Sequence, residues 1–147
     1  MNSGKEILKW PLIVAACVVV LRVVLERAGA PEFVNNVLGV AYLHTLLVPI
    51  YIAVRLSKSD RPRPYGTQVM LVALYAVLTR IMILPTYWAG RIYEWPQNRF
   101  NGTWGPGVGP FEGFVGVPLV TAGIWIVMSI VVGSILGSAI IAVIRRK

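Results

Sequence analysis

Cysteine and histidine are nearly absent from this sequence of 147 residues, which contains one of each. Because Cys17 has no second cysteine to pair with, an intrachain disulfide and a multi-cysteine metal cluster are both excluded. His44 is the single histidine, and no His, Cys, Asp and Glu residues follow one another at the spacing of metal ligands. The sequence therefore predicts neither a metal site nor a cofactor.

Charged residues are also scarce, at 14% of the chain against the roughly 25% of soluble domains. Apolar residues make up 56%, and a water-soluble domain of this size could not bury so much apolar surface. Most of the chain falls into four apolar segments, each near the roughly 20 residues that cross about 30 Å of hydrocarbon. We expect one compact membrane domain over residues 1–147, with no room for a second domain.

Acidic residues number only six against 14 Lys and Arg, which gives a formal net charge of +8. Such a charge first suggests nucleic acid, but its distribution argues against that partner. The N-terminal segment, the connection after the second span and the C-terminal segment lie on one side of a four-span chain and together carry most of the positive charge. This positive-inside pattern predicts cytoplasmic N- and C-termini, in a multi-pass protein of the bacterial inner (plasma) membrane.

The predicted fold is all-α: an integral membrane four-helix bundle, N-in and C-in, with antiparallel neighbours. Turn residues separate the helices at Gly29-Ala30-Pro31 and in the basic connection over residues 57–66. The four spans are expected over residues 12–28, 33–56, 68–93 and 118–144.

The first span also has features of a signal peptide, because Lys5 and Lys9 precede its apolar core. Residues 14–17, VAAC, match a lipoprotein cleavage box. An apolar stretch follows Cys17, where a lipoprotein would have a polar tether, so we expect the segment to stay in the membrane.

The long connection over residues 96–117 is rich in glycine, proline and aromatic residues. We expect an ordered outer loop that acts as a lid, with Phe100, Trp104, Phe111 and Phe114 packed onto the end of the bundle. The alternative is a loose hairpin that dips these rings into the membrane interface. Residues 101–103, NGT, match a glycosylation acceptor, but Asn-Gly is equally a turn signal, and we favour the turn.

Ionisable residues inside the spans are the main indication of function, because burying them in lipid is costly. Counted from Trp10, Val34 and Gln68, where the first three spans are expected to enter the membrane, Arg22, His44 and Arg80 lie about 18, 15 and 18 Å deep, near the midplane of the membrane. Pro49 and Pro85 each free a helix carbonyl one residue from His44 or Arg80. Broken helices of this kind often line a cavity.

These residues predict a polar cavity, open outward, that binds an anionic or amphiphilic small molecule or lipid for binding or transport. Arg80 and Arg22 would hold the anion, Glu26 would balance charge, His44 would donate a hydrogen bond, and Tyr87, Trp88, Arg91 and Trp95 would form the mouth. The predicted ligand-binding residues are Arg22, Glu26, His44, Arg80, Tyr87 and Arg91. The structural alternative has Arg22 reaching out to the interface and His44 hydrogen-bonded inside the bundle.

Two further functions are consistent with the sequence. A structural or accessory subunit would dock a partner, or a second copy, through the small-residue face of Ser129, Gly133 and Gly137. The same face could simply pack against the other three spans. An intramembrane enzyme would use His44 as a general base oriented by Glu26. A haem on His44 would need a second ligand. We place binding above catalysis, because no pair of close acids lies at membrane depth, and we expect membrane lipids as partners.

Overall fold

The computed structural model describes residues 4–59, 62–95 and 108–146. These residues form helices and no strand. Four helical segments are long and apolar enough to cross a membrane, as the sequence predicts. They are Gly4–Arg27, Val40–Ser57, Pro64–Ile92 and Glu112–Arg145. The protein is therefore an all-helical chain with four candidate membrane spans.

The first helix, α1 (Gly4–Arg27), begins earlier than the predicted residue 12. Its buried face follows the helical period through Leu8, Pro11, Ala15 and Val19. The charged residues of its first two turns sit on the exposed side of the same helix. The predicted start lies too far along the chain because the charged residues were taken as the helix boundary. In the structure they occupy one face of a continuous helix.

The second span is shorter than predicted and is made of several pieces. A separate helix, α2 (Glu32–Val37), is followed by Gly39 in an extended conformation, with φ −72° and ψ 145°. The span itself then runs through α3 (Val40–Tyr42), the π-helix η1 (Leu43–Leu47) and α4 (Val48–Ser57). The predicted span over residues 33–56 therefore includes a break at Gly39, and its continuous candidate part begins at Val40. The observed segment Val40–Ser57 has 18 residues, which extend about 27 Å as a helix.

The third span is the single helix α5 (Pro64–Ile92), which continues through Pro85. Proline suits its first position, where the missing N–H costs little, so the helix starts before the predicted residue 68. The fourth span starts with the π-helix η2 (Glu112–Gly116) and continues as α7 (Val117–Arg145). The predicted loop over residues 96–117 is therefore too long at its end, and residues 96–107 lie outside the described residues.

Both π-helices stand directly before a proline near the start of the next helix. The N–H of Val48 reaches the carbonyl of Leu43, and the N–H of Val117 reaches that of Glu112, five residues back in each case. Pro49 and Pro118 follow and have no N–H to give, so the regular four-residue pattern is interrupted there. The wider π-helical turn accommodates the missing donor. Such turns are frequent at functional sites.

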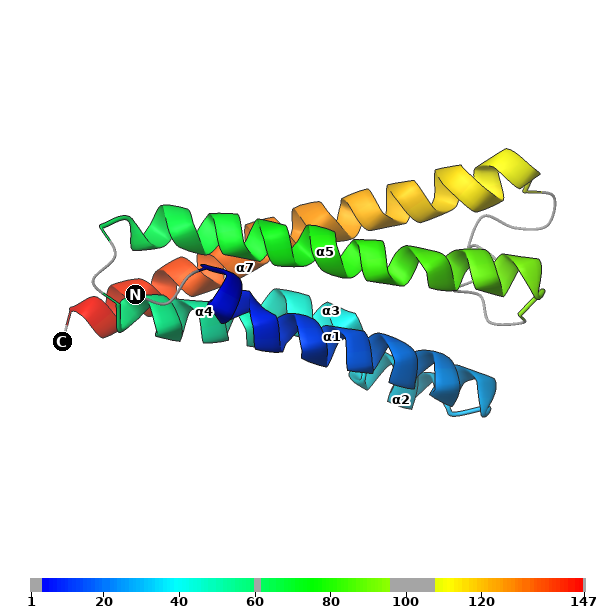
Figure 1. Ribbon diagram of the computed structural model, residues 1–147, viewed down its shortest axis with the longest axis horizontal. Helices are drawn as coiled ribbons and strands as arrows, with labels where there is room; N and C mark the ends of the chain where they lie inside the picture. Colours follow the sequence, from blue (N-terminus) through cyan, green and yellow to red (C-terminus); the bar gives the residue numbers. More distant parts are fainter. Residues whose placement is uncertain (1–3, 60–61, 96–107, 147) are drawn as a thin grey trace.

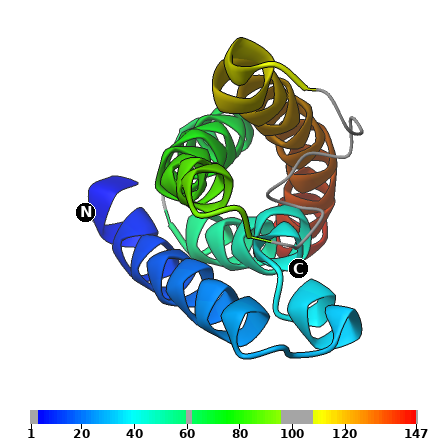
Figure 2. The same ribbon diagram turned by 90° about the vertical axis from the view of Figure 1, so that its right-hand side faces the viewer.

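The helices pack side by side along one long axis (Figure 1). α1 begins, α4 ends, α5 begins and α7 ends at the same end of the molecule, which we call the terminal end. α7 packs against α5 and α4, whereas α1 packs mainly against α5 (Figure 2). The Arg145 Nη2 donates to the Ser59 carbonyl at 2.9 Å and ties α7 to the end of α4.

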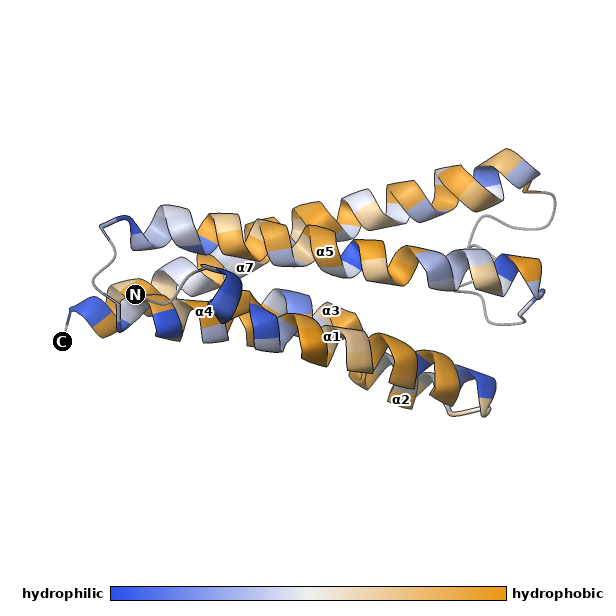
Figure 3. Cartoon of the chain, viewed as in Figure 1, coloured by the Kyte–Doolittle hydropathy of each residue, from blue (hydrophilic) through white to orange (hydrophobic). Residues whose placement is uncertain are grey.

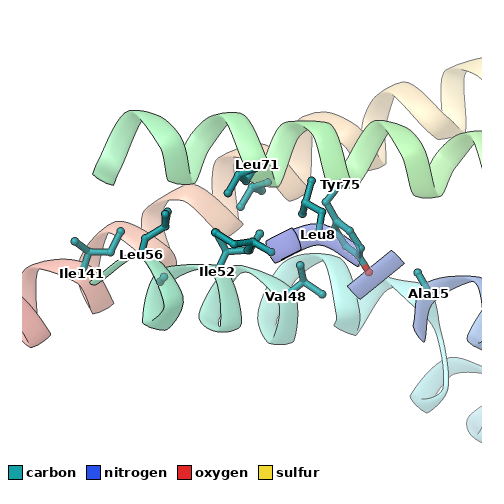
Figure 4. Close-up of a cluster of buried hydrophobic side chains, with 11 residues drawn as sticks. Leu8, Ala15, Val48, Ile52, Leu56, Leu71, Tyr75 and Ile141 are labelled. Atoms are coloured by element: carbon teal, nitrogen blue, oxygen red, sulfur yellow. The ribbon is translucent and has the colours of Figure 1, made fainter. Parts of the chain in front are cut away.

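An apolar cluster fills the terminal half of the molecule (Figure 4). It draws on all four spans and includes Leu8, Ala15, Ile52, Leu71 and Ile141. Hydrophilic residues gather at the two ends, and the middle of the helices is mostly hydrophobic on the outside as well (Figure 3). The apolar side chains exposed in mid-helix are what a lipid-facing surface requires.

Candidate functional site

A second, smaller apolar cluster shows which residues of three spans lie at the same height along the long axis of the molecule. Val19 of α1, Val40 of α3 and Ile83 of α5 pack together, with Tyr87 beside them. Because the helices run in known directions, every nearby residue can be placed by counting from this cluster at about 1.5 Å per residue. His44 lies about 6 Å from it toward the terminal end, and Arg80 about 4.5 Å in the same direction.

His44 and Arg80 therefore share a level, and polar side chains join them there. His44 is fully buried in η1 and its Nε2 lies 3.1 Å from Thr79 Oγ1 on α5. The hydroxyl of Thr79 also lies 2.7 Å from the Tyr75 carbonyl oxygen, to which it donates its one hydrogen. Thr79 Oγ1 is thus left to accept a hydrogen bond from the His44 ring.

Tyr75, Arg80 and Trp125 complete this group. The rings of His44 and Tyr75 lie 5.1 Å apart, tilted by 54°. The guanidinium of Arg80 lies over the ring of Trp125 on α7, at 5.4 Å from its centroid. The Arg80 charge is close enough to act on both His44 and Tyr75. We call His44, Tyr75, Thr79, Arg80 and Trp125 the His44–Arg80 cluster.

Arg22 and Glu26, one helical turn apart on α1, form an ion pair with 3.0 Å between Nε and Oε1. The carboxylate of Glu26 is buried, and the Arg22 side chain is partly exposed. Arg22 lies about 4.5 Å beyond Val19 toward the end away from the termini, so about 9 Å of helix length separates it from the level of Arg80. The two arginines therefore do not share one depth.

Glu26 and His44 are farther apart still. Glu26 lies seven residues beyond Val19, and His44 lies on the other side of the small apolar cluster, so their levels differ by about 16 Å. A general base must be within hydrogen-bond reach of the group that orients it. The structure thus gives no shared pocket to the His44 and Glu26 pair on which the enzyme hypothesis depends.

Arg91 lies about 16 Å along α5 from Arg80, at the end away from the termini. Its Nη2 donates to the Val108 carbonyl at 2.8 Å, and its guanidinium lies over the Phe114 ring at 5.8 Å. A side chain at Gly113 would overlap this guanidinium, so the glycine makes room for it. Arg91 thus ties α5 to the start of the fourth span.

Trp88 makes a second tie at the same place. Its indole Nε1 donates to the Phe114 carbonyl at 2.8 Å. Pro118, four residues after Phe114, has no N–H for that carbonyl, so Trp88 supplies a donor that the helix lacks. The predicted mouth residues Trp88 and Arg91 therefore link α5 to η2, while Tyr87 packs against the small apolar cluster.

The small-residue face of α7 is buried inside the molecule. Ser129, Gly133 and Gly137 are all buried, and a Cβ at Gly133 would lie 2.8 Å from the Pro49 ring. A Cβ at Gly137 would overlap the side chain of Gln68. Of the two uses considered for this face, the structure contains internal packing, with α4 and α5 occupying the surface that a partner would need.

Sequence reasoning missed three members of the His44–Arg80 cluster: Tyr75, Thr79 and Trp125. A signal for two of them was present, because Gln68, Val72, Tyr75, Thr79 and Ile83 follow a three- and four-residue spacing along one face of α5, and all five are buried. Nothing local marks Trp125, whose partner Arg80 is 45 positions away.

Metal ligands are not grouped in the part of the chain that the structure describes: no three His, Cys, Asp or Glu side chains come together there. Comparison with protein-family models, curated proteins and solved structures gives no match to this chain. The His44–Arg80 cluster is therefore interpreted from its own geometry.

Proposed function

We propose that this protein is a multi-pass membrane protein that binds or transports an anionic or amphiphilic small molecule or lipid at the His44–Arg80 cluster. One observation carries the proposal. Arg80 is only 7% exposed, in the middle of a 29-residue candidate span, among polar side chains from η1 and α5. A cation at such a depth is costly and typically belongs to a substrate or ion pathway.

The chemistry of Arg80 supports an anion as the ligand. Its guanidinium face lies over the ring of Trp125, and the N–H groups of a guanidinium lie in the plane of that group. That planar fork matches the two oxygens of a carboxylate or phosphate. His44 lies at the same level and adds a polar ring that can donate or accept.

The remaining charged residues take roles different from those the sequence predicted. Arg22 and Glu26 form a neutral pair on α1, so we assign them to stabilising the helix ends and not to holding the anion. Arg91 and Trp88 hold α5 against the start of the fourth span, where they would border an entrance.

We further propose that the protein is a four-helix bundle with both termini in the cytoplasm, in the bacterial inner membrane, and that the ligand enters from outside. Lys58, Arg63, Arg145 and Arg146 lie at the terminal end, in agreement with the positive-inside rule. The terminal half is filled by the large apolar cluster and by close glycine contacts of α7. Among the described residues, the apolar cluster nearest to this site on the opposite side is the small one of Val19, Val40 and Ile83.

Native mass spectrometry of the detergent-purified protein tests this function. Wild type is compared with Arg80→Leu, since leucine is compatible with a lipid environment, and with Arg55→Leu as the control. Arg55 is exposed and lies near the terminal end of α4, so the control removes the same charge away from the cluster. We expect a defined anionic adduct on wild type and on Arg55→Leu, and its loss from Arg80→Leu.

Two other results would overturn the proposal. An identical bare spectrum for all three proteins would make Arg80 a structural residue. A stoichiometric partner protein on all three would instead identify an accessory subunit, which is the main competing function.

A further inference from the structure

The hydroxyl of Tyr75 is a buried polar group of the His44–Arg80 cluster that the proposed function has not used. Tyr75 is 1% exposed, and its hydroxyl oxygen has no hydrogen-bond partner among the described residues. Figure 4 shows its side chain reaching away from α5, with the oxygen at the tip. Buried hydroxyls are nearly always hydrogen-bonded, so an unsatisfied one indicates an occupant that the protein alone does not supply.

The surroundings of this hydroxyl define what the occupant can be. The Tyr75 ring lies 5.1 Å from the His44 ring, and the charge of Arg80 acts on both side chains. A phenolic hydroxyl next to a cation is best used as a donor to a negatively charged oxygen, because the cation already holds that oxygen in place. An anionic group at this level would be offered two donors of different type, a phenolic hydroxyl and a guanidinium.

The remainder of the neighbourhood is aliphatic. Tyr75 belongs to the large apolar cluster, where it is grouped with Leu8, Ala15 and Val48. A free inorganic anion would have to give up its hydration to reach this depth among apolar side chains. An acyl chain attached to the anionic group is compatible with it and with the hydrocarbon depth of the site.

We propose that the Tyr75 hydroxyl is a specificity-determining donor that binds one oxygen of an acyl-chain oxyanion while Arg80 binds another. This inference rests on the proposed function and adds the ligand class to it. The ligand is a carboxylate or phosphate carried on an acyl chain, with at least two acceptor oxygens. A fatty acid and an anionic phospholipid share this chemistry.

Titration of the full-length protein in detergent with palmitate, and separately with phosphatidylglycerol, tests the inference by native mass spectrometry. The two probes distinguish a free fatty acid from a lipid headgroup. Tyr75→Phe removes only the hydroxyl, and Tyr51→Phe is the matched control on α4, where the ring lies beside Arg55. We expect Tyr75→Phe to bind the preferred probe about ten-fold more weakly, as the loss of one hydrogen bond to a charged group implies.

Thermal melting without a probe provides the readout that a purely structural role would not give. Because Tyr75→Phe removes a buried unsatisfied group, we expect its unliganded melting temperature to equal or exceed that of wild type. Tyr51→Phe should change neither affinity by more than the error of the titration. Weaker binding together with unchanged or higher stability is the result that supports the inference.

Three results would overturn it. If Tyr75→Phe binds as wild type does while Arg80→Leu loses its adduct, the proposed function stands and the role of Tyr75 fails. If Tyr75→Phe melts lower and binds normally, the hydroxyl is satisfied by buried water and is structural. If wild type binds neither palmitate nor phosphatidylglycerol, the acyl oxyanion is the wrong ligand class, whatever adduct the purified protein carries.

Discussion

At the scale of single residues, the charged groups divide into a neutral pair and a cation kept among polar rings. Glu26 is 5% exposed and its carboxylate accepts from Arg22 one helical turn back. Removing one partner of a buried pair leaves an uncompensated charge, which costs far more than losing the pair as a whole.

Glu26→Ala should therefore destabilise the protein by on the order of 3 kcal/mol, because Arg22 would stay charged without its partner. The double variant Arg22→Leu with Glu26→Ala should recover most of that loss. Chemical unfolding in detergent micelles measures both. If the double variant is as unstable as the sum of the two single ones, the two side chains are not coupled, and the pair does not stabilise this end of α1.

The depth of ionisable residues was predictable from the sequence only in part. Counting residues placed His44 and Arg80 at similar levels, and in the structure His44 contacts Thr79, the neighbour of Arg80 in sequence. The count did not separate Arg22 from these two, because it took Trp10 as the membrane entry of the first span, whereas the level of Arg22 follows from how α1 packs through Val19. Trp125 could not be predicted, because its contact with Arg80 depends on how α7 rotates against α5.

At the scale of elements, prolines and glycines determine how closely the helices approach. At the break predicted near Pro49, the structure has a π-helical turn. The helix before it ends ahead of the extended Gly39, and a hydropathy profile does not resolve either feature. The spacing of Ser129, Gly133 and Gly137 predicted a close contact but not which neighbour would fill it. That choice depends on the shapes of Pro49 and Gln68, two side chains on other helices.

Gly133→Ala should destabilise the protein by about 1–3 kcal/mol, because the new methyl group would press on the rigid Pro49 ring. Gly123→Ala on the same helix is the matched control. No atom lies within 4 Å of its new Cβ, so the better helix propensity of alanine should leave stability equal or slightly higher. Thermal melting in one detergent compares the two. Equal melting temperatures would show that α7 does not pack on Pro49 in the membrane protein.

At the scale of the whole molecule, charge and packing agree on an orientation. The terminal end brings together the start of α1, the connection between α4 and α5, and the end of α7 (Figure 1). At this end of the described chain, Lys5, Lys9, Lys58, Arg63 and Arg145 outnumber the acidic Glu6. At the opposite end, basic residues alternate with Glu94 and Glu112. Only the terminal end has the excess of Lys and Arg that holds a loop in the cytoplasm.

Reporter fusions in a bacterial host should therefore place residue 147 in the cytoplasm and the connection at Ala30 outside. A fluorescent protein after Lys147 should fluoresce and alkaline phosphatase there should be inactive, with the reverse pattern at Ala30. The opposite result would place the large apolar cluster in the outer half of the membrane. The His44–Arg80 cluster would then be reached from the cytoplasm, if the ligand enters from the end away from the termini as proposed. A ligand of that site would have to be an anion from inside the cell, so the orientation decides where the ligand should be sought.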